Sequence, residues 1–138
     1  MTKLVINTDG GSRGNPGPAA IGVILKSTKE MTKIGKYIGR TTNNVAEYSA
    51  LIEALKAAKG LKATELECLL DSELVVKQLN GQYRLENPKI QQFFIEIWNL
   101  KFDFKSIKFK HIPRERNREA DRLVNKALDA EACPQKLF

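Results

Sequence analysis

The hydrophobic pattern of this chain first changes its period at Val45, and that change restricts the possible folds more than any other feature. Before it, apolar residues predict three strands, over residues 3–9, 19–26 and 32–39. From Val45 onward, apolar residues recur every three or four positions as far as Gly60, a residue type that commonly ends helices. The chain therefore begins with three strands and continues into a long helix.

The second half alternates between the two kinds of element. Apolar runs predict strands over residues 65–70 and 106–110, and helical spacing predicts helices over about 72–79, 88–100 and 117–130. The order β-β-β-α-β-α-α-β-α implies helical crossovers between later strands, which are then parallel. We predict an α/β fold with a five-stranded mixed sheet flanked by helices.

The size and composition fit one globular domain. The 138 residues are 42% hydrophobic and 28% charged, and we predict a core over residues 3–129 with a short tail over residues 130–138. No apolar run resembles a secretory segment or a membrane span, so we expect a cytoplasmic protein without membrane association. Cys68 and Cys133 are expected to be a core thiol and a tail thiol, without disulfide or zinc.

The charge balance narrows the class of partner. The chain carries 23 Lys and Arg against 16 Asp and Glu, a formal net charge of +7. Lys and Arg make most protein contacts to phosphate groups, so this excess favours a nucleic acid. The alternative is a basic surface that only keeps the protein in solution.

Four carboxylates stand at the ends of elements or on helix faces, and each alone has a simple structural explanation. Asp9 belongs to an Asp-Gly turn, and Asp71 follows a strand where an acid commonly caps the next helix. Glu47 stands where it would complete an Asn-x-x-Glu capping box, and Asp121 lies near Arg118, with which it could form an ion pair. No single one of these acids indicates a function.

Their combination indicates more. Two of the acids follow strands, and two lie on helices that could pack against the same edge of the sheet. Clustered carboxylates repel one another unless cations neutralise them, and hard oxygen ligands favour magnesium or manganese. The set suits metal-dependent hydrolysis of phosphodiesters.

Four ordered motifs carry a resemblance to a known family: DGGSRGNPGP, TNNVAEYSALIEAL, LLDSELV and NREADRLVNKAL. Over residues 3–129 they make the chain similar to ribonuclease H type 1, in the compact form of archaea and some bacteria. That form lacks the additional basic helix and loop of longer members. The resemblance implies the ribonuclease H-like fold and cleavage of the RNA strand of RNA/DNA hybrids.

The resemblance also implies roles for the acids. The family's catalytic carboxylates match Asp9, Glu47, Asp71 and Asp121, which would hold two Mg²⁺ or Mn²⁺ ions. Two ions of this kind clamp the attacking and leaving oxygens of an in-line displacement. The implied products carry a 5′-phosphate and a 3′-hydroxyl.

Further positions match residues that contact the hybrid. These are Asn15, Asn43 and Asn44, with Arg13 as a contact to phosphate. Amide side chains suit this role because the shallow minor groove of an A-like duplex exposes 2′-hydroxyl groups. The alternative for the three Asn residues is that they satisfy backbone groups at turns.

Two cationic candidates lie before the last helix. His111 stands ten residues before Asp121, where many family members carry a histidine that assists product release. It also ends a strand and precedes Pro113, which would fix it in place. Arg114 could instead supply the cation to the scissile phosphate, or pair with a neighbouring Glu on the surface.

Glu73 departs from the family pattern, because it stands where the longer form commonly carries a Gln that meets the RNA strand. Two other functions remain open: a hybrid-binding module without catalysis, and a related nuclease on the same fold. We expect a monomer. Whether double-stranded RNA is also a substrate is open.

Overall fold

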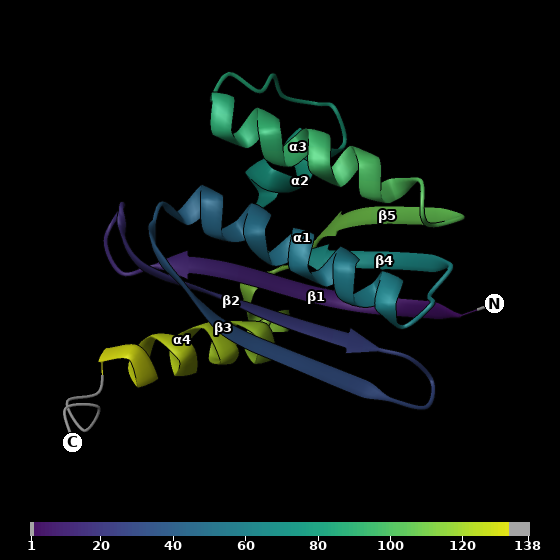
Figure 1. The fold of residues 1–138 in the computed structure, drawn as a ribbon, viewed down its shortest axis with the longest axis horizontal. Coiled ribbons are helices and arrows are strands. Elements are labelled where there is room, and N and C mark those ends of the chain that lie inside the picture. The colour runs from purple at the N-terminus through teal and green to yellow at the C-terminus, as the bar shows by residue number, and fades with distance from the viewer. Residues whose placement is uncertain (1, 133–138) are drawn as a thin grey trace.

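The computed structural model describes residues 2–132 and contains one five-stranded sheet (Figure 1). The strands are β1 (Lys3–Ser12), β2 (Gly17–Lys26), β3 (Met31–Thr41), β4 (Glu65–Leu70) and β5 (Ser106–His111). Their spatial order is β3-β2-β1-β4-β5. β1, β2 and β3 pair antiparallel, whereas β4 pairs parallel with both β1 and β5. The predicted α/β fold with a mixed sheet is confirmed.

Helices cover both faces of this sheet. The helices are α1 (Asn43–Gly60), α2 (Glu73–Leu79), α3 (Pro88–Lys101) and α4 (Arg118–Ala132), and a short 3-10 helix, η1 (Arg114–Arg116), precedes α4. Figure 1 shows α1, α2 and α3 on one side of the sheet and α4 on the other. Because β1, β4 and β5 are parallel, the chain must cross over between them through helices. These crossovers place α1, α2 and α3 on the same face of the sheet.

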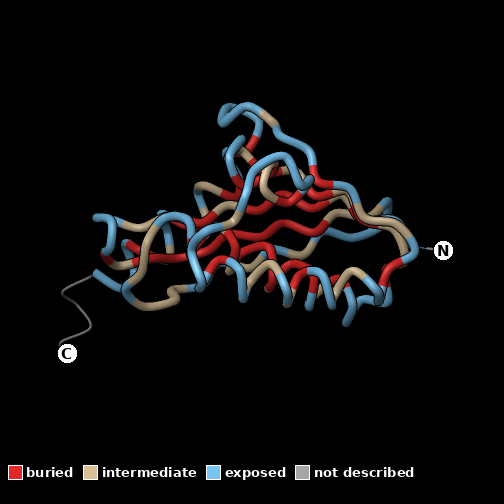
Figure 2. Tube along the Cα trace, turned by 90° about the horizontal axis from the view of Figure 1, so that it is seen from above, coloured by how far each residue is buried: buried red, intermediate tan, exposed pale blue. Residues whose placement is uncertain are grey.

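The main core lies between the sheet and α1. Tyr48, Leu51 and Leu55 of α1 are fully buried against strand residues such as Ile6 and Ile21. Burying one such side chain contributes roughly 1.5–3 kcal/mol relative to leaving it exposed. A smaller cluster under α4 contains Ala20, Val124 and Leu128. Figure 2 shows the buried residues concentrated along the strands and the inner turns of the helices.

Two glycines allow helices to approach the sheet closely. A Cβ atom at Gly10 of β1 would lie 2.3 Å from the backbone carbonyl of Ala46 in α1. A Cβ atom at Gly22 of β2 would lie 2.2 Å from the carbonyl oxygen of Ala120 in α4. Both helices therefore pack with their N-terminal turns against strand backbone, near the same end of β1.

Several predicted boundaries were wrong. β1 continues past residue 9, because pairing with β2 extends to Ser12 opposite Ala19. α1 is capped by Thr42, whose Oγ1 accepts a hydrogen bond from the Val45 amide at 3.3 Å, so the capping box considered above as the alternative role of Glu47 does not form. η1 was not predicted at all, since three residues carry no periodicity.

At the C-terminal end, α4 begins at Arg118, one residue later than predicted, and continues to Ala132. It therefore extends into the segment that was predicted to be a tail, while Cys133 and the rest of that segment lie outside the described residues. Cys68 is a buried free thiol, as predicted. Among residues 2–132, no helix combines the length and the apolar character required to cross a bilayer.

Candidate active site

The strand register brings Asp9 and Asp71 together. β1 and β4 are parallel, with Thr8 opposite Leu70, so Asp9 and Asp71 are the next residues on neighbouring strands. β4 ends there, whereas β1 continues. Where β4 stops, side chains from helices on both faces of the sheet can reach Asp9 and Asp71.

Glu47 and Asp121 reach this edge from opposite sides. Glu47 lies in the first turns of α1 and Asp121 in the first turn of α4. All four predicted acids line one cleft of about 330 Å³, together with Arg114. The structure therefore brings together the four carboxylates that the sequence predicted.

Burial and mutual repulsion act strongly on Asp9. Burial is the largest cause, and together with the charges of Asp71, Asp121 and Glu47 it raises the pKa of the Asp9 carboxyl group from 3.8 to about 8. A side-chain hydrogen bond with Asp121 also favours the protonated form. Asp9 is thus protonated at neutral pH unless a cation offsets the surrounding negative charge.

Glu47 shows the same need for a cation. Burial raises its pKa to about 7, although a hydrogen bond with Ser72 and the charge of Arg114 act in the opposite direction. Its Oε2 atom is buried and accepts no hydrogen bond from the described residues. A buried carboxylate oxygen without a partner is costly, and a divalent cation would satisfy it.

The chemistry of the donors fits Mg²⁺ or Mn²⁺, since all four are carboxylates. In the described part of the chain, no three acidic, His or Cys side chains already converge as a set of ligands around one point. Asp9, Glu47, Asp71 and Asp121 are the residues that would hold the ions.

Asn117 is a buried residue of the site that sequence reasoning assigned only to a helix start. It is 1% exposed. Its Nδ2 donates to Asp71 Oδ2 at 2.8 Å and to the Thr8 carbonyl at 2.9 Å, while its Oδ1 accepts from Asn7 Nδ2 at 3.1 Å. Its own carbonyl accepts from the Asp121 amide at 3.1 Å. One side chain thus fixes Asp71 relative to β1 and to the start of α4.

We expect Asn117→Ala to lower kcat by about 10- to 100-fold, because Asp71 loses the donor that orients it. The fold should lose about 2 kcal/mol, since buried acceptors remain unpaired. Steady-state kinetics and urea unfolding measure the two effects. Asn7→Ala is the matched control, because it leaves the contact between Asn117 and Asp71 in place. Equal losses of kcat in both variants would contradict a specific role for Asn117.

The two cationic candidates occupy different places. Arg114 lines the cleft of the four carboxylates, and its charge lowers the pKa of Glu47. His111 is the exposed last residue of β5 and does not line this cleft. It lies instead near Glu73, whose pKa is lowered chiefly by a hydrogen bond and the charge of Lys77, with a smaller contribution from His111. The geometry favours Arg114 over His111 as the cation nearest the reacting groups.

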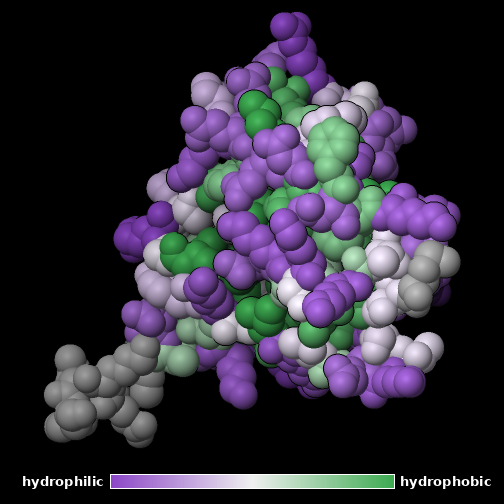
Figure 3. All heavy atoms as spheres, turned by 45° about the vertical axis from the view of Figure 1, so that its right-hand side comes forward, coloured by the Kyte–Doolittle hydropathy of each residue, from purple (hydrophilic) through white to green (hydrophobic). Residues whose placement is uncertain are grey.

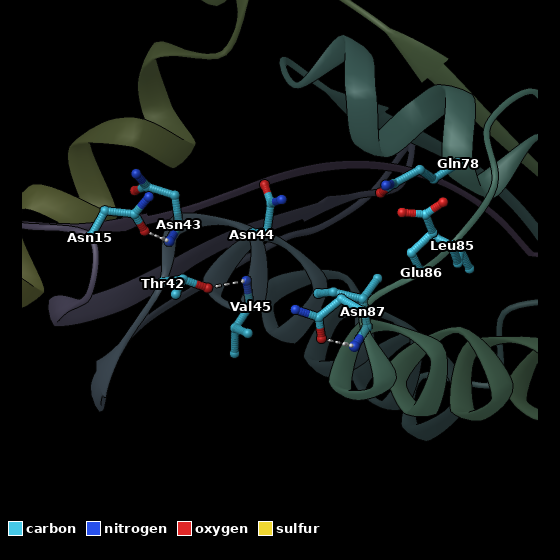
Figure 4. A pocket seen from close by; sticks show the side chains of 10 residues that line it. Asn15, Thr42, Asn43, Asn44, Val45, Gln78, Leu85, Glu86 and Asn87 are labelled. Atoms are coloured by element: carbon cyan, nitrogen blue, oxygen red, sulfur yellow. Dashed lines mark hydrogen bonds between the residues drawn. The ribbon is translucent and has the colours of Figure 1, made fainter.

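A second hollow, of about 410 Å³, adjoins the carboxylate cleft and shares Asn43 with it. Figure 4 shows Asn15, Asn43 and Asn44 along its rim. Asn15 Oδ1 accepts from the Asn43 amide at 3.0 Å, and Asn43 Oδ1 accepts from the Ser12 amide at 2.9 Å. The oxygens of both therefore satisfy backbone groups at turns, the alternative raised above, while their NH₂ groups donate to no described residue.

Arg13 and Glu73 are both engaged by other side chains. Arg13 Nη2 lies 2.6 Å from Asp129 and 3.4 Å from Asn125 of α4. Glu73 forms an ion pair with Lys77 one helical turn later, at 2.8 Å. A contact of Arg13 with phosphate would compete with its carboxylate partner.

Comparison with known proteins agrees with this geometry. A family profile described as reverse transcriptase-like matches residues 7–127. A ribonuclease HI of Halobacterium salinarum is 44% identical over 88% of this chain and 62% of that relative. The chain belongs to the ribonuclease H type 1 family. A bifunctional protein of Mycobacterium tuberculosis is also 44% identical, over 94% of this chain and 36% of its own length.

Solved ribonuclease H structures superpose closely on this chain. The Halobacterium salinarum enzyme has a TM-score of 0.89 at 42% identity, over 93% of this chain and 98% of that one. LC11-RNase H1, solved in complex with an RNA/DNA hybrid, has a TM-score of 0.89 at 43% identity, over 94% and 99%. The chain spans about a third of the mycobacterial relative and under two thirds of the halobacterial sequence. The ribonuclease H-like fold predicted from the sequence is confirmed.

Proposed function

We propose that this protein is a ribonuclease H that hydrolyses the RNA strand of RNA/DNA hybrids. The observation that carries the proposal is the convergence of Asp9, Glu47, Asp71 and Asp121 in one cleft. Family membership and the hybrid bound to LC11-RNase H1 support the choice of substrate. A binding module without catalysis would gain nothing from four carboxylates that face a polyanion.

We further propose that the carboxylates hold two Mg²⁺ or Mn²⁺ ions. Bound there, the ions would activate water and neutralise the charge that develops on the phosphate. Asp9 would lose its proton to act as a ligand, and the hydrogen bond from Asn117 would keep Asp71 oriented. Arg114, which lines the same cleft, would pair with the phosphate. The products would carry a 5′-phosphate and a 3′-hydroxyl.

The hollow beside the cleft supports recognition of RNA. Asn15, Asn43 and Asn44 line it, and the unused NH₂ groups of Asn15 and Asn43 can donate to 2′-hydroxyl oxygens. Because Asn43 also lines the carboxylate cleft, a strand bound there would continue into the reacting position. This arrangement favours a hybrid substrate over duplex DNA, which lacks the 2′-hydroxyl. Action as a cytoplasmic monomer, and cleavage of double-stranded RNA, stay predictions.

A cleavage assay tests the proposal. The protein is incubated with end-labelled RNA paired to DNA, in Mg²⁺, in Mn²⁺ and in EDTA, beside RNA/RNA and DNA/DNA duplexes. We expect internal cuts in the RNA of the hybrid with either metal and none in EDTA. Cleavage of DNA/DNA would indicate the related nuclease, and tight hybrid binding without cleavage would indicate the binding module.

A further inference from the structure

The outer face of α4 carries a stripe of positive charge. Arg118, Arg122 and Lys126 recur every four residues, a spacing that places them on one side of a helix, and all three are exposed. The opposite side of α4 is apolar and packs on the sheet through Ala120, Val124 and Leu128. We call Arg118, Arg122 and Lys126 the α4 stripe.

Within residues 2–132, no acid forms an ion pair with Arg118, Arg122 or Lys126 of the α4 stripe. Asp129 lies on the same face but is engaged by Arg13 at 2.6 Å, and Glu119 pairs with Lys26 and Lys33 of the sheet. Like charges four residues apart weaken a helix. A bound polyanion would remove this repulsion.

The α4 stripe lies next to the carboxylate cleft. α4 forms one wall of that cleft through Asp121, Val124, Asn125 and Leu128. Arg122 precedes Asn125 by three residues, so it occupies the adjacent position on the helix surface. From Arg118 to Lys126 the stripe spans about 12 Å, or three to four base pairs of duplex rise. Figure 1 shows α4 on the face of the sheet opposite α1, α2 and α3.

The segment that lines the neighbouring hollow offers less charge. The segment 80–87 between α2 and α3 contains one cation, Arg84. Figure 3 shows a different kind of surface, on which hydrophilic side chains surround separate hydrophobic patches. On α4, by contrast, three exposed cations are aligned beside the reacting groups.

We propose that the α4 stripe binds phosphates of the duplex arm that extends from the carboxylate cleft. The inference rests on the proposed function, because it assumes that the duplex is held in that cleft. It assigns to α4 a second role in addition to carrying Asp121. The occupant is identified by charge complementarity: a row of cations on a rigid helix matches a row of phosphates.

The test compares two variants that each remove two positive charges. Arg122→Gln with Lys126→Gln alters the α4 stripe. Lys29→Gln with Lys62→Asn is the control. Lys29 lies in the turn after β2, and Lys62 follows the C-terminal end of α1, so both lie away from the end of the sheet that carries Asp9. Asn is chosen at Lys62 because its φ of 60° suits Asn. Binding of a fluorescent hybrid is measured by anisotropy in EDTA over a range of NaCl concentrations.

We expect the stripe variant to weaken hybrid binding about tenfold at low salt and to reduce the slope of log Kd against log salt by about 1.8. The control should retain the slope of the wild type, and so should the charge-preserving variant Arg122→Lys. A stripe variant with the slope of the wild type, or equal changes in stripe and control variants, would overturn the inference. Wild-type protein that neither binds nor cleaves hybrid would overturn the proposed function and the inference together.

Discussion

Asp9→Asn is expected to lower the rate of hybrid cleavage by on the order of 10³-fold and at the same time to stabilise the metal-free fold. Cleavage falls because a ligand that helps to place the ions, worth several kcal/mol in the transition state, is lost. Stability rises because the pKa of Asp9 is raised to about 8 in the folded protein, above its unfolded value of 3.8. The stabilising effect of protonation is complete below about pH 4 and is lost as the pH rises to 8.

The gain in the free energy of unfolding should therefore be on the order of 2 kcal/mol at pH 8 in EDTA and close to zero at pH 4. Urea unfolding at the two pH values measures it. Glu30→Gln is a control with the same change of charge, at an exposed residue just before β3. A variant that retains most of the activity, or that is destabilised at pH 8, would contradict the assignment of Asp9.

Gly10→Ala should produce a large loss of stability for a single added methyl group. The new Cβ would lie 2.3 Å from the Ala46 carbonyl and 2.5 Å from the Glu47 amide, both of them backbone groups. Relief requires α1 to move away from β1, at a cost of about 3 kcal/mol and a fall in Tm of about 10 °C. Glu47 moves with the helix, so kcat should fall by on the order of 100-fold.

Gly11→Ala is the matched control, one residue along the same strand. There the nearest atom to an added Cβ is Val124 Cγ1 at 3.6 Å, an ordinary contact. Thermal unfolding and steady-state kinetics of the two variants should differ clearly. Equal Tm values for the two variants would contradict the close packing of α1 on β1 at Gly10.

The positions of the four acids could be predicted because each depends on the strand or helix next to it in the sequence. Asp71 follows an apolar strand, Glu47 lies in the first turns of a periodic helix, and parallel pairing brings strand ends to one edge. The reach of β1 beyond Asp9 could not be predicted in the same way. A run of DGGS is typical of a turn, and only pairing with β2 keeps it extended as far as Ser12.

The contribution of Asn117 depends on contacts that are remote in sequence. Its partners Asn7, Thr8 and Asp71 lie 46 to 110 residues away. In the sequence, the position of Asn117 before a helix is already explained by helix capping. A buried amide side chain leaves no periodic pattern that could reveal it. The same limit applied to Thr42, since neighbouring Thr and Asn residues are all acceptable caps.

The most direct test of the carboxylate cluster is a calorimetric titration of Mg²⁺ into the protein between pH 6 and pH 8. Asp9 is protonated below about pH 8 and Glu47 below about pH 7, and both must lose their protons to bind an ion, so the apparent affinity should rise at least tenfold per pH unit. Protons should be released, seen as heat that depends on the buffer, and Asp9→Asn should release about one proton fewer than the wild type at each pH below 8. Affinity that is independent of pH, or unchanged in that variant, would contradict a metal site built on these four carboxylates.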